Sequence, residues 1–321
     1  MSALHKKFLG VEVGGSSSMK SSNIGGQAVM EGVMMRNADK YAVAVRKTDG
    51  EIVVKTEEYK GIVQNKKIRS LPIIRGVFSF IDSMVLGMST LTYSASFFMD
   101  EEEEEKDEKK ESVMMGLTIA CSVVMAVAIF MILPYFLSQL FRKVTDSTTL
   151  ITLLEGAVRL VIFFGYILLI SRMKDIQRVF MYHGAEHKCI NCIEHGMELN
   201  VENVLKSSRL HKRCGTSFLF IVMIVSIIFF LFIRIESPIW RVVFRLLLIP
   251  VIAGVSFEFI RLAGKSENKL VIFLSKPGMM LQKLTTREPD ASMAEVAIAS
   301  VEAVFDWRAY LKENFGWQEK V

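Results

Sequence analysis

Four of the five histidines and three of the four cysteines in this 321-residue chain lie within 32 residues, at positions 183 to 214. The stretch opens with His183-Gly-Ala-Glu-His187. Side chains four residues apart project from the same side of a helix, so the two imidazoles can bind one ion. Because zinc takes histidine, cysteine and carboxylate ligands in proteins, the stretch predicts a divalent metal site, with zinc the best match.

Glu186 lies between the two histidines and adds a candidate catalytic group. The order His-x-x-Glu-His is that of inverzincin metalloproteases, in which the glutamate is the general base that acts on a zinc-polarised water. If the site is open to substrate, Glu186 is therefore the predicted catalytic residue. The pattern is short, however, and a histidine pair on a helix is often only a surface or hydrogen-bonded pair.

A second pair of candidate ligands follows further along the chain. His211 and Cys214 are three residues apart and directly precede a long apolar run. An ion shared by both pairs would therefore lie at the edge of a membrane, held by ligands from the two ends of one segment. The predicted ligands are His183, His187, His211 and Cys214.

The same segment supports a competing assignment. Cys189-x-x-Cys192, followed after eighteen intervening residues by His211-x-x-Cys214, has the spacing of a closed Cys₃His structural zinc site. Such a site leaves no coordination position open and does no chemistry. A third interpretation needs no metal, because Cys-x-x-Cys is also compatible with two packed thiols.

Long apolar segments must position these residues. The chain is 51% apolar, with a mean hydropathy of +0.35, which argues against an ordinary soluble protein. Runs at 114–137, 150–170, 216–235 and 239–262 each approach or exceed the roughly 20 residues that a membrane-crossing helix needs. We therefore predict a mainly α protein, a polytopic membrane helical bundle with about four spans.

The distribution of charge orients these spans. The segment 171–215 is rich in lysine and arginine, whereas 138–149 contains only Arg142 and Lys143. By the positive-inside rule, the His/Cys-rich helical loop is cytoplasmic, and the basic residues after position 260 place the C-terminus on the same side. The first 20 residues do not resemble a cleavable signal, so four spans place both termini in the cytoplasm.

Residues 72–98 are the ambiguous segment. Apolar residues recur there at helical spacing after Ser70 and Pro72, which predict the start of a helix. Many serines and threonines make the stretch only weakly apolar, so we favour a helix in the membrane interface or packed on the bundle. A fifth span is the alternative, and it would move the His/Cys-rich loop outside.

Composition divides the rest of the chain. Residues 1–23 predict a flexible tail, and 24–69 a small β-rich cytoplasmic element with a hairpin turn at Asp49-Gly50. The other predicted segments are an amphipathic or interfacial helix at 70–99, an acidic linker at 100–113, a four-span membrane domain at 114–290 that contains the metal-like loop 171–215, and a C-terminal amphipathic helix at 291–321.

The apolar runs contain charged residues, among them Glu155, Arg159, Arg241, Arg245 and Glu258. Each costs about 2.5–3.5 kcal/mol to insert into hydrocarbon, so we expect them to face one another or a wet cavity. Pairing of Glu155 with Arg159 or Arg245 is the structural interpretation. A polar cavity beneath the metal site, for transport or for a lipid-facing active site, is the functional one.

Four motifs together resemble one family. They are 25–36 (Gly-Gly-Gln-Ala-Val-Met-Glu-Gly-Val-Met-Met-Arg), 72–76 (Pro-Ile-Ile-Arg-Gly), 182–188 (Tyr-His-Gly-Ala-Glu-His-Lys) and 213–218 (Arg-Cys-Gly-Thr-Ser-Phe). Over roughly residues 24–310 the chain is similar to the YqhQ-like bacterial membrane proteins, a family of unknown function described as predicted metal-dependent enzymes. The resemblance implies a multi-pass protein of the bacterial inner (plasma) membrane. It implies no particular reaction.

The resemblance also bears on individual residues. It supports the site residues His183, Glu186, His187, His211 and Cys214, and adds Glu194 as a further candidate ligand. Cys189 and Cys192 depart from the family pattern, which favours the His/His/His/Cys site over the Cys₃His site. The motif at 25–36 gains weight, and we hypothesise that Glu31 and Arg36 approach the metal-like loop.

Three functions fit these features. The first is a zinc-dependent hydrolase at the cytoplasmic membrane surface, acting on a peptide, a lipid-linked substrate or a phosphate ester. The second is a non-catalytic, metal-stabilised membrane scaffold whose β element recruits a protein partner. The third is a transporter that uses the intramembrane charges, disfavoured because no internal repeat of the spans is visible. Membrane lipid is an expected partner, and no nucleic-acid partner is predicted.

Overall fold

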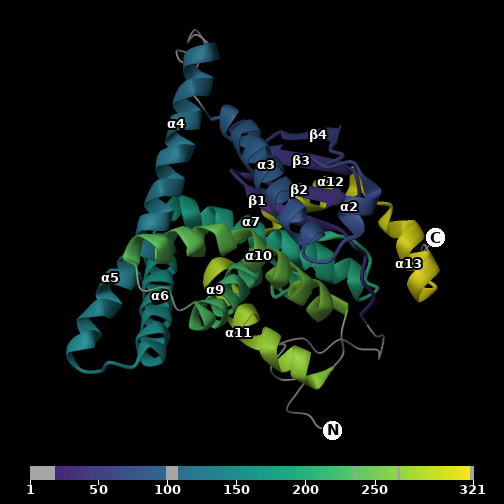
Figure 1. Cartoon of the computed structure of the whole chain (residues 1–321). Helices are drawn as coiled ribbons and strands as arrows, with labels where there is room; N and C mark the ends of the chain where they lie inside the picture. The colour runs from purple at the N-terminus through teal and green to yellow at the C-terminus, as the bar shows by residue number, and fades with distance from the viewer. Residues whose placement is uncertain (1–18, 99–107, 234, 236, 266–267, 319–321) are drawn as a thin grey trace.

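The computed structural model describes residues 19–98, 108–233, 235, 237–265 and 268–318. It is mainly helical, with one small sheet near the N-terminus (Figure 1). Five helices are long and apolar enough to cross a membrane, as judged by length and composition. Four of them cover the apolar runs expected to span, and the fifth covers residues 74–96. The predicted helical protein with a small N-terminal β element is therefore confirmed.

The sheet is an antiparallel meander of β1 (Gly25–Val29), β2 (Gly32–Asn37), β3 (Lys40–Arg46) and β4 (Ile52–Glu58), in that order. β1 is an edge strand, and Gly25 pairs with Arg36 at its beginning. The last hairpin turns near Gly50, whose φ of +92° is a conformation that favours glycine. The hairpin predicted from Asp49-Gly50 is thus confirmed.

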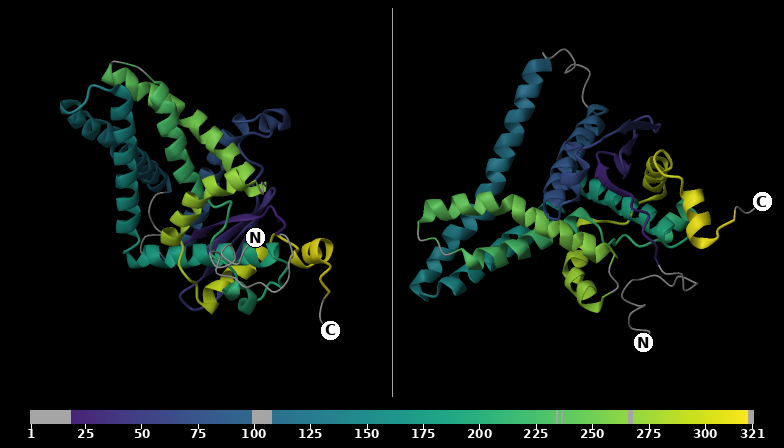
Figure 2. Two further views of the ribbon diagram at one scale, coloured as in Figure 1. Left: turned by 90° about the horizontal axis from the view of Figure 1, so that it is seen from below. Right: turned by 45° about the vertical axis from the view of Figure 1, so that its right-hand side comes forward.

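Helices cover both faces of this sheet (Figure 2). They are α3 (Ile74–Ser96), α7 (Lys174–Glu194) and α12 (Ala291–Glu302). Val33 and Met35 pack on one side, in a core with residues of α7 and α12. Met34 packs on the other side with Leu86 of α3. Because both faces are buried, β2 and β3 are nearly continuous apolar runs instead of alternating ones.

The helix α3 begins later than the sequence analysis predicted. Ser70 ends the short helix α2 (Lys66–Ser70), and Pro72 precedes a tight turn. In this turn Ile73 has φ +66° and ψ −54°, and the Ile74 amide donates to the Pro72 carbonyl at 2.7 Å. The predicted start at Ser70 and Pro72 is therefore wrong. A positive φ is strained for a β-branched residue, so neighbouring structure must hold the turn.

The helix α10 (Pro238–Lys265) holds this turn in place. A Cβ added to Gly254 would lie 2.6 Å from the Ile73 carbonyl oxygen, so only glycine permits this approach. Arg75 and Glu258 also form an ion pair across the two helices, with Nε 2.6 Å from Oε1. As a result, α3 is fixed to α10 at its beginning and to the sheet through its second half.

The other helices of the apolar part lie beside this layered part (Figure 1). They are α4 (Glu108–Val127), η2 (Ala128–Ile132), α5 (Leu133–Gln139), η3 (Leu140–Lys143), α6 (Thr148–Ile170), α9 (Gly215–Phe232) and α11 (Lys269–Thr285). Of these, α4 projects away from the rest (Figure 1). α9 packs on α6, α10 and α11. The C-terminal segment, predicted as one amphipathic helix, contains α12 and a second helix, α13 (Trp307–Phe315).

Three of the charged residues in the apolar runs form one buried cluster. The Glu155 carboxylate accepts from Arg159 at 2.9 Å and from Arg245 at 2.5 and 2.9 Å. Arg159 also donates to the Phe130 carbonyl, at 2.9 Å, in the π-helical turn η2. In a π-helical turn the backbone hydrogen bonds run from i to i+5, which leaves a carbonyl oxygen able to accept from a side chain. The predicted pairing of Glu155 is confirmed.

Candidate functional site

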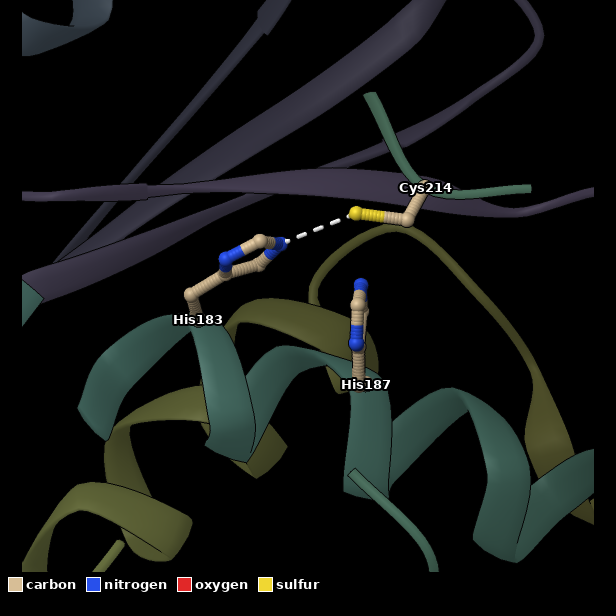
Figure 3. Close-up of side chains that lie close together, drawn as sticks. All are labelled: His183, His187 and Cys214. Carbon is tan, nitrogen blue, oxygen red and sulfur yellow. Dashed lines mark hydrogen bonds between the residues drawn. The ribbon is translucent and has the colours of Figure 1, made fainter. Parts of the chain in front are cut away.

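Three of the predicted ligands meet beside the sheet. His183 and His187 project from α7, and Cys214 is the residue before α9 (Figure 3). One candidate ligand atom from each lies within 4.8 Å of the others. Among the residues that the structure describes, no other group of three or more histidine, cysteine or acidic residues meets this condition. The two ends of the 171–215 segment are thus brought together.

Backbone carbonyl groups orient both imidazoles. His183 Nδ1 lies 2.9 Å from the Thr285 carbonyl oxygen, and His187 Nδ1 lies 2.6 Å from that of Arg209. A carbonyl oxygen only accepts, so each Nδ1 must carry a proton. In each ring Nε2 is then the nitrogen left to bind a metal or a second proton. This arrangement is the usual outer shell of a metal-binding histidine.

Polar side chains of α7 also bind the segment that carries Cys214 into place. Lys188, Asn191 and His187 all turn toward residues 205–210, which include the end of the short helix α8 (Val201–Lys206) and the residues after it. Their acceptors are the backbone carbonyls of Leu205, Ser207, Ser208, Arg209 and Leu210, at 2.6 to 3.0 Å. The segment therefore wraps around α7 before the chain reaches Cys214.

The surroundings of Cys214 favour a thiolate. Its Sγ lies 3.4 Å from the Thr216 amide nitrogen at the beginning of α9, and 3.3 Å from His183 Nε2. Burial alone raises the pKa of a thiol, but the two imidazoles outweigh it and hold the pKa of Cys214 well below its usual value. Burial lowers the pKa of His187, yet the charges of Cys214 and Glu186 raise it overall to about 9. Without a bound metal ion, these two pKa shifts favour a Cys214 thiolate paired with a His187 imidazolium.

Glu186 lies inside the same cluster. Its Oε2 is 3.5 Å from His187 Nε2 and 4.0 Å from His183 Nε2, and the residue is only 4% exposed. Gly26 of β1 covers it, because a Cβ there would lie 2.8 Å from Glu186 Cγ. The carboxylate therefore lies near the Nε2 atoms, where a metal would bind. A general base or a further metal ligand has to lie at this position.

His211 and Glu194 form an adjoining network. The ring centroid of His211 is 5.8 Å from that of His187, but its Nε2 lies 3.4 Å from Glu194 Oε2. The buried Glu194 also accepts from the Ser22 amide at 2.7 Å and from Arg213. Burial raises the pKa of Glu194, but these partners outweigh it and lower the pKa. Both predicted ligands lie beside the group of three and bind each other.

Cys189 and Cys192 have the surroundings of packed thiols. Both are buried in the core between α7, the sheet and α12. Burial raises the pKa of both thiols, that of Cys192 to about 12. Cys192 is nine residues after His183, which places it on the opposite side of α7. Neither cysteine belongs to the group of three, so the packed-thiol interpretation fits these contacts better than a Cys₃His site.

The hairpin of β1 and β2 is anchored to the helix that carries the site. Glu31, in its turn, forms a two-pronged ion pair with Arg178 of α7 and accepts from the Tyr182 hydroxyl at 3.3 Å. Arg36 makes its contact elsewhere: its Nε donates to the Ala38 carbonyl at 2.9 Å. The hypothesis that both residues approach the metal-like loop therefore holds for Glu31 alone.

Three groups that orient or cover the site were not identified from the sequence. Thr285 and Arg209 act through backbone carbonyls, which carry no residue-type signal. Gly26 did have a signal, because Gly25-Gly26 opens the 25–36 motif. Its contact with Glu186 explains why this position excludes a side chain.

Comparison with known proteins places these features in a wider group. The model of the family described as "Protein of unknown function (DUF1385)" matches residues 71–307. The chain is also 36% identical, over 301 residues, to "Uncharacterized protein YqhQ" of Bacillus subtilis (strain 168), which covers 90% of this chain and 94% of that protein. No solved structure matches the chain. The resemblance drawn from the four motifs is therefore confirmed.

The electrostatics of the site predict a thiolate at neutral pH. After chelation, the protein should show thiolate ultraviolet absorbance at about pH 7, and Cys214→Ser should remove it. Cys192→Ser is the matched control, because burial keeps that thiol protonated. Equal absorbance in wild type and Cys214→Ser would contradict this prediction.

The raised pKa of His187 also predicts how stability depends on pH. Protonation of His187 stabilises the folded protein fully below the pKa of about 6.5 that the residue has in the unfolded chain. This contribution to the free energy of unfolding should be lost as the pH rises through about 9.

Proposed function

We propose that this chain, which belongs to the DUF1385 family of proteins of unknown function, is a membrane protein that binds a divalent metal ion, zinc, through His183, His187 and Cys214. The observation that carries the proposal is the orientation of the imidazoles, each with Nδ1 on a backbone carbonyl and Nε2 left for a ligand. Two imidazoles and a thiolate suit zinc, and three protein ligands leave a position open, as in catalytic sites.

Glu186 makes a hydrolase the activity that the site supports best. When bound, the ion would polarise a carbonyl or phosphoryl oxygen and lower the pKa of water. Glu186 Oε2 lies within 4.0 Å of both Nε2 atoms, so it is placed to take a proton from water at that point and to return it to a leaving group. β1 and α7 exclude bulk water from this carboxylate, which is buried.

We further propose four spans in the bacterial inner membrane, with the site on the cytoplasmic side. The sheet precedes α3 in the chain, whereas α7 and α12 follow α3, yet all three pack in one core. If α4–α5, α6, α9 and α10 each cross the membrane, the sheet and α7 lie on one side only when α3 does not cross. The basic residues of 171–215 favour the cytoplasm for that side.

The exposed surface of α3 supports the same arrangement. One side of this helix packs on the sheet, and the other exposes a row of large apolar side chains that suits the lipid interface. These are Ile81, Met84, Val85, Met88 and Leu91. An interfacial α3 would keep the sheet at the membrane surface, next to the ends of α9 and α11 that meet at the site.

Metal analysis of purified protein tests the ligand set. Wild type should carry about one zinc ion per chain, and His183→Ala or Cys214→Ala should lose most of it. His211→Ala should keep the metal, because His211 Nε2 lies on Glu194. His195→Ala is the control, since its Nδ1 lies 2.7 Å from the Asn191 carbonyl oxygen. Full metal content in both ligand variants would rule out the site.

The Glu186→Gln variant tests catalysis. It should retain zinc, while turnover of nitrophenyl esters of short acyl chains or of phosphate falls by about 10²–10⁴-fold, the usual contribution of a general base. Glu202→Gln on the exposed surface of α8 is the matched control and should leave turnover unchanged. Undiminished turnover in Glu186→Gln, or wild-type turnover that survives chelation, would contradict the hydrolase.

Reporter fusions test the topology. A reporter that is active only outside the cytoplasm should give a signal when fused after Asp146, between η3 and α6, and none when fused after Leu205 or after the C-terminal helix α13. The physical reason is that the sheet, α7 and α12 share one core and must lie on one side. An outside signal after Leu205 would overturn the four-span arrangement.

A further inference from the structure

A cavity of about 470 Å³ lies between the beginning of the sheet, α3 and α10. Its wall includes Asn23, Gly25, Gly26 and Gln27 from the beginning of β1 and just before it, together with Arg36 of β2 and Phe257 of α10. This volume lies within the range of small-molecule sites. Most of these residues belong to the 25–36 motif, whose sequence the metal site explains only in part.

Arg36 is the one charged residue in the wall of this cavity. Its guanidinium is held by the Ala38 carbonyl at 2.9 Å and the Tyr59 carbonyl at 3.5 Å, and it lies 5.3 Å from the centre of the Tyr59 ring. These partners fix its position without neutralising its charge. Among the described residues no carboxylate forms an ion pair with Arg36, so the cavity favours an anionic group.

The apolar part of the wall points to an amphiphile. Met34, Leu86 and Phe257 line the cavity beside Arg36. The neighbouring surface of α3 exposes Met84 and Val85, at 55% and 47%, and α10 is one of the helices apolar enough to cross a membrane. A ligand with an anionic head and an apolar chain could therefore place its head in the cavity and keep its chain along α3.

The two glycines of β1 lie between the cavity and the metal site. A Cβ added to Gly25 would meet no atom within 4 Å, so the strand leaves open space at this point. A Cβ added to Gly26, which also lines the cavity, would lie 2.8 Å from Glu186 Cγ. At these two glycines only the backbone of β1 separates the cavity from the Glu186 side chain.

We propose that this cavity binds the phosphate head group of a membrane amphiphile, with Arg36 as its anion-binding residue. The proposal goes beyond the proposed function and does not rest on it, because Arg36 and the glycines bind the head group without the metal ligands. A fork of guanidinium N–H groups matches the oxygens of phosphate, and the apolar wall distinguishes a lipid phosphate from a soluble one.

Binding to the purified full-length chain, measured by calorimetry, tests the proposal. The probes are dihexanoyl phosphatidic acid, the uncharged dihexanoylglycerol and inorganic phosphate. Phosphatidic acid should bind, and each of the other two should bind at least about tenfold more weakly, because one lacks the charge and the other the chains. Equal binding of the uncharged lipid would overturn the role of Arg36, and equal binding of inorganic phosphate would overturn the amphiphile.

Two variants locate the binding in the cavity. Arg36→Gln removes the charge, and Gly25→Leu fills the open space without meeting another atom at its Cβ. Each should weaken phosphatidic acid binding at least about tenfold. The matched controls are Arg142→Gln and Gly165→Leu, the second also in open space, and both should bind as wild type does. If Arg36→Gln fails to fold, Gly25→Leu still tests whether the ligand binds in the cavity. Phosphatidic acid binding as strong in Gly25→Leu as in wild type would overturn the proposal.

A third variant separates this proposal from the metal site. His183→Ala should bind phosphatidic acid as wild type does, because His183 does not line the cavity. Zinc-loaded protein that does not bind phosphatidic acid would contradict the cavity proposal alone. Protein without zinc that binds phosphatidic acid through Arg36 would contradict the metal-dependent function alone.

Discussion

The site depends on the burial of a polar helix. Every residue from 184 to 194 of α7 is buried, although this stretch contains several charged and polar side chains. Burying such groups without partners costs several kcal/mol, so partners must come with them. The carbonyls of residues 205–210 supply them for His187, Lys188 and Asn191. The same hydrogen bonds that satisfy α7 therefore fix the path of the chain to Cys214.

This arrangement ties the site to the apolar part of the fold. Cys214 caps the beginning of α9, and Thr285, whose carbonyl holds His183, is the last residue of α11. The core around α7 meanwhile draws on segments before and after this part. The site is therefore complete only where the layered part meets the packed helices α9 and α11. A metal bound here would join the core of the layered part to the ends of the two apolar helices α9 and α11.

Sequence patterns predicted the parts that residue type and periodicity encode. The apolar runs, the Gly50 turn and the convergence of His183, His187 and Cys214 were all accessible in this way. The start of α3 was not, because the strained turn at Ile73 depends on a glycine of α10 distant in sequence. Residue spacing alone left the roles of Cys189 and Cys192 open, and it was the resemblance to the family that favoured Cys214 as the ligand.

The anchoring of β1 keeps Glu186 covered. Glu31 holds the end of the hairpin to α7, and Gln27 Nε2 donates to the Gly87 carbonyl of α3 at 3.2 Å. Lifting the strand away from Glu186 would break both attachments together with the apolar packing on both faces of the sheet. The cavity between β1, α3 and α10 does not bypass the strand, because Gly26, in its wall, lies between the cavity and Glu186. The anchored strand therefore keeps the cavity and the carboxylate apart, on its two sides.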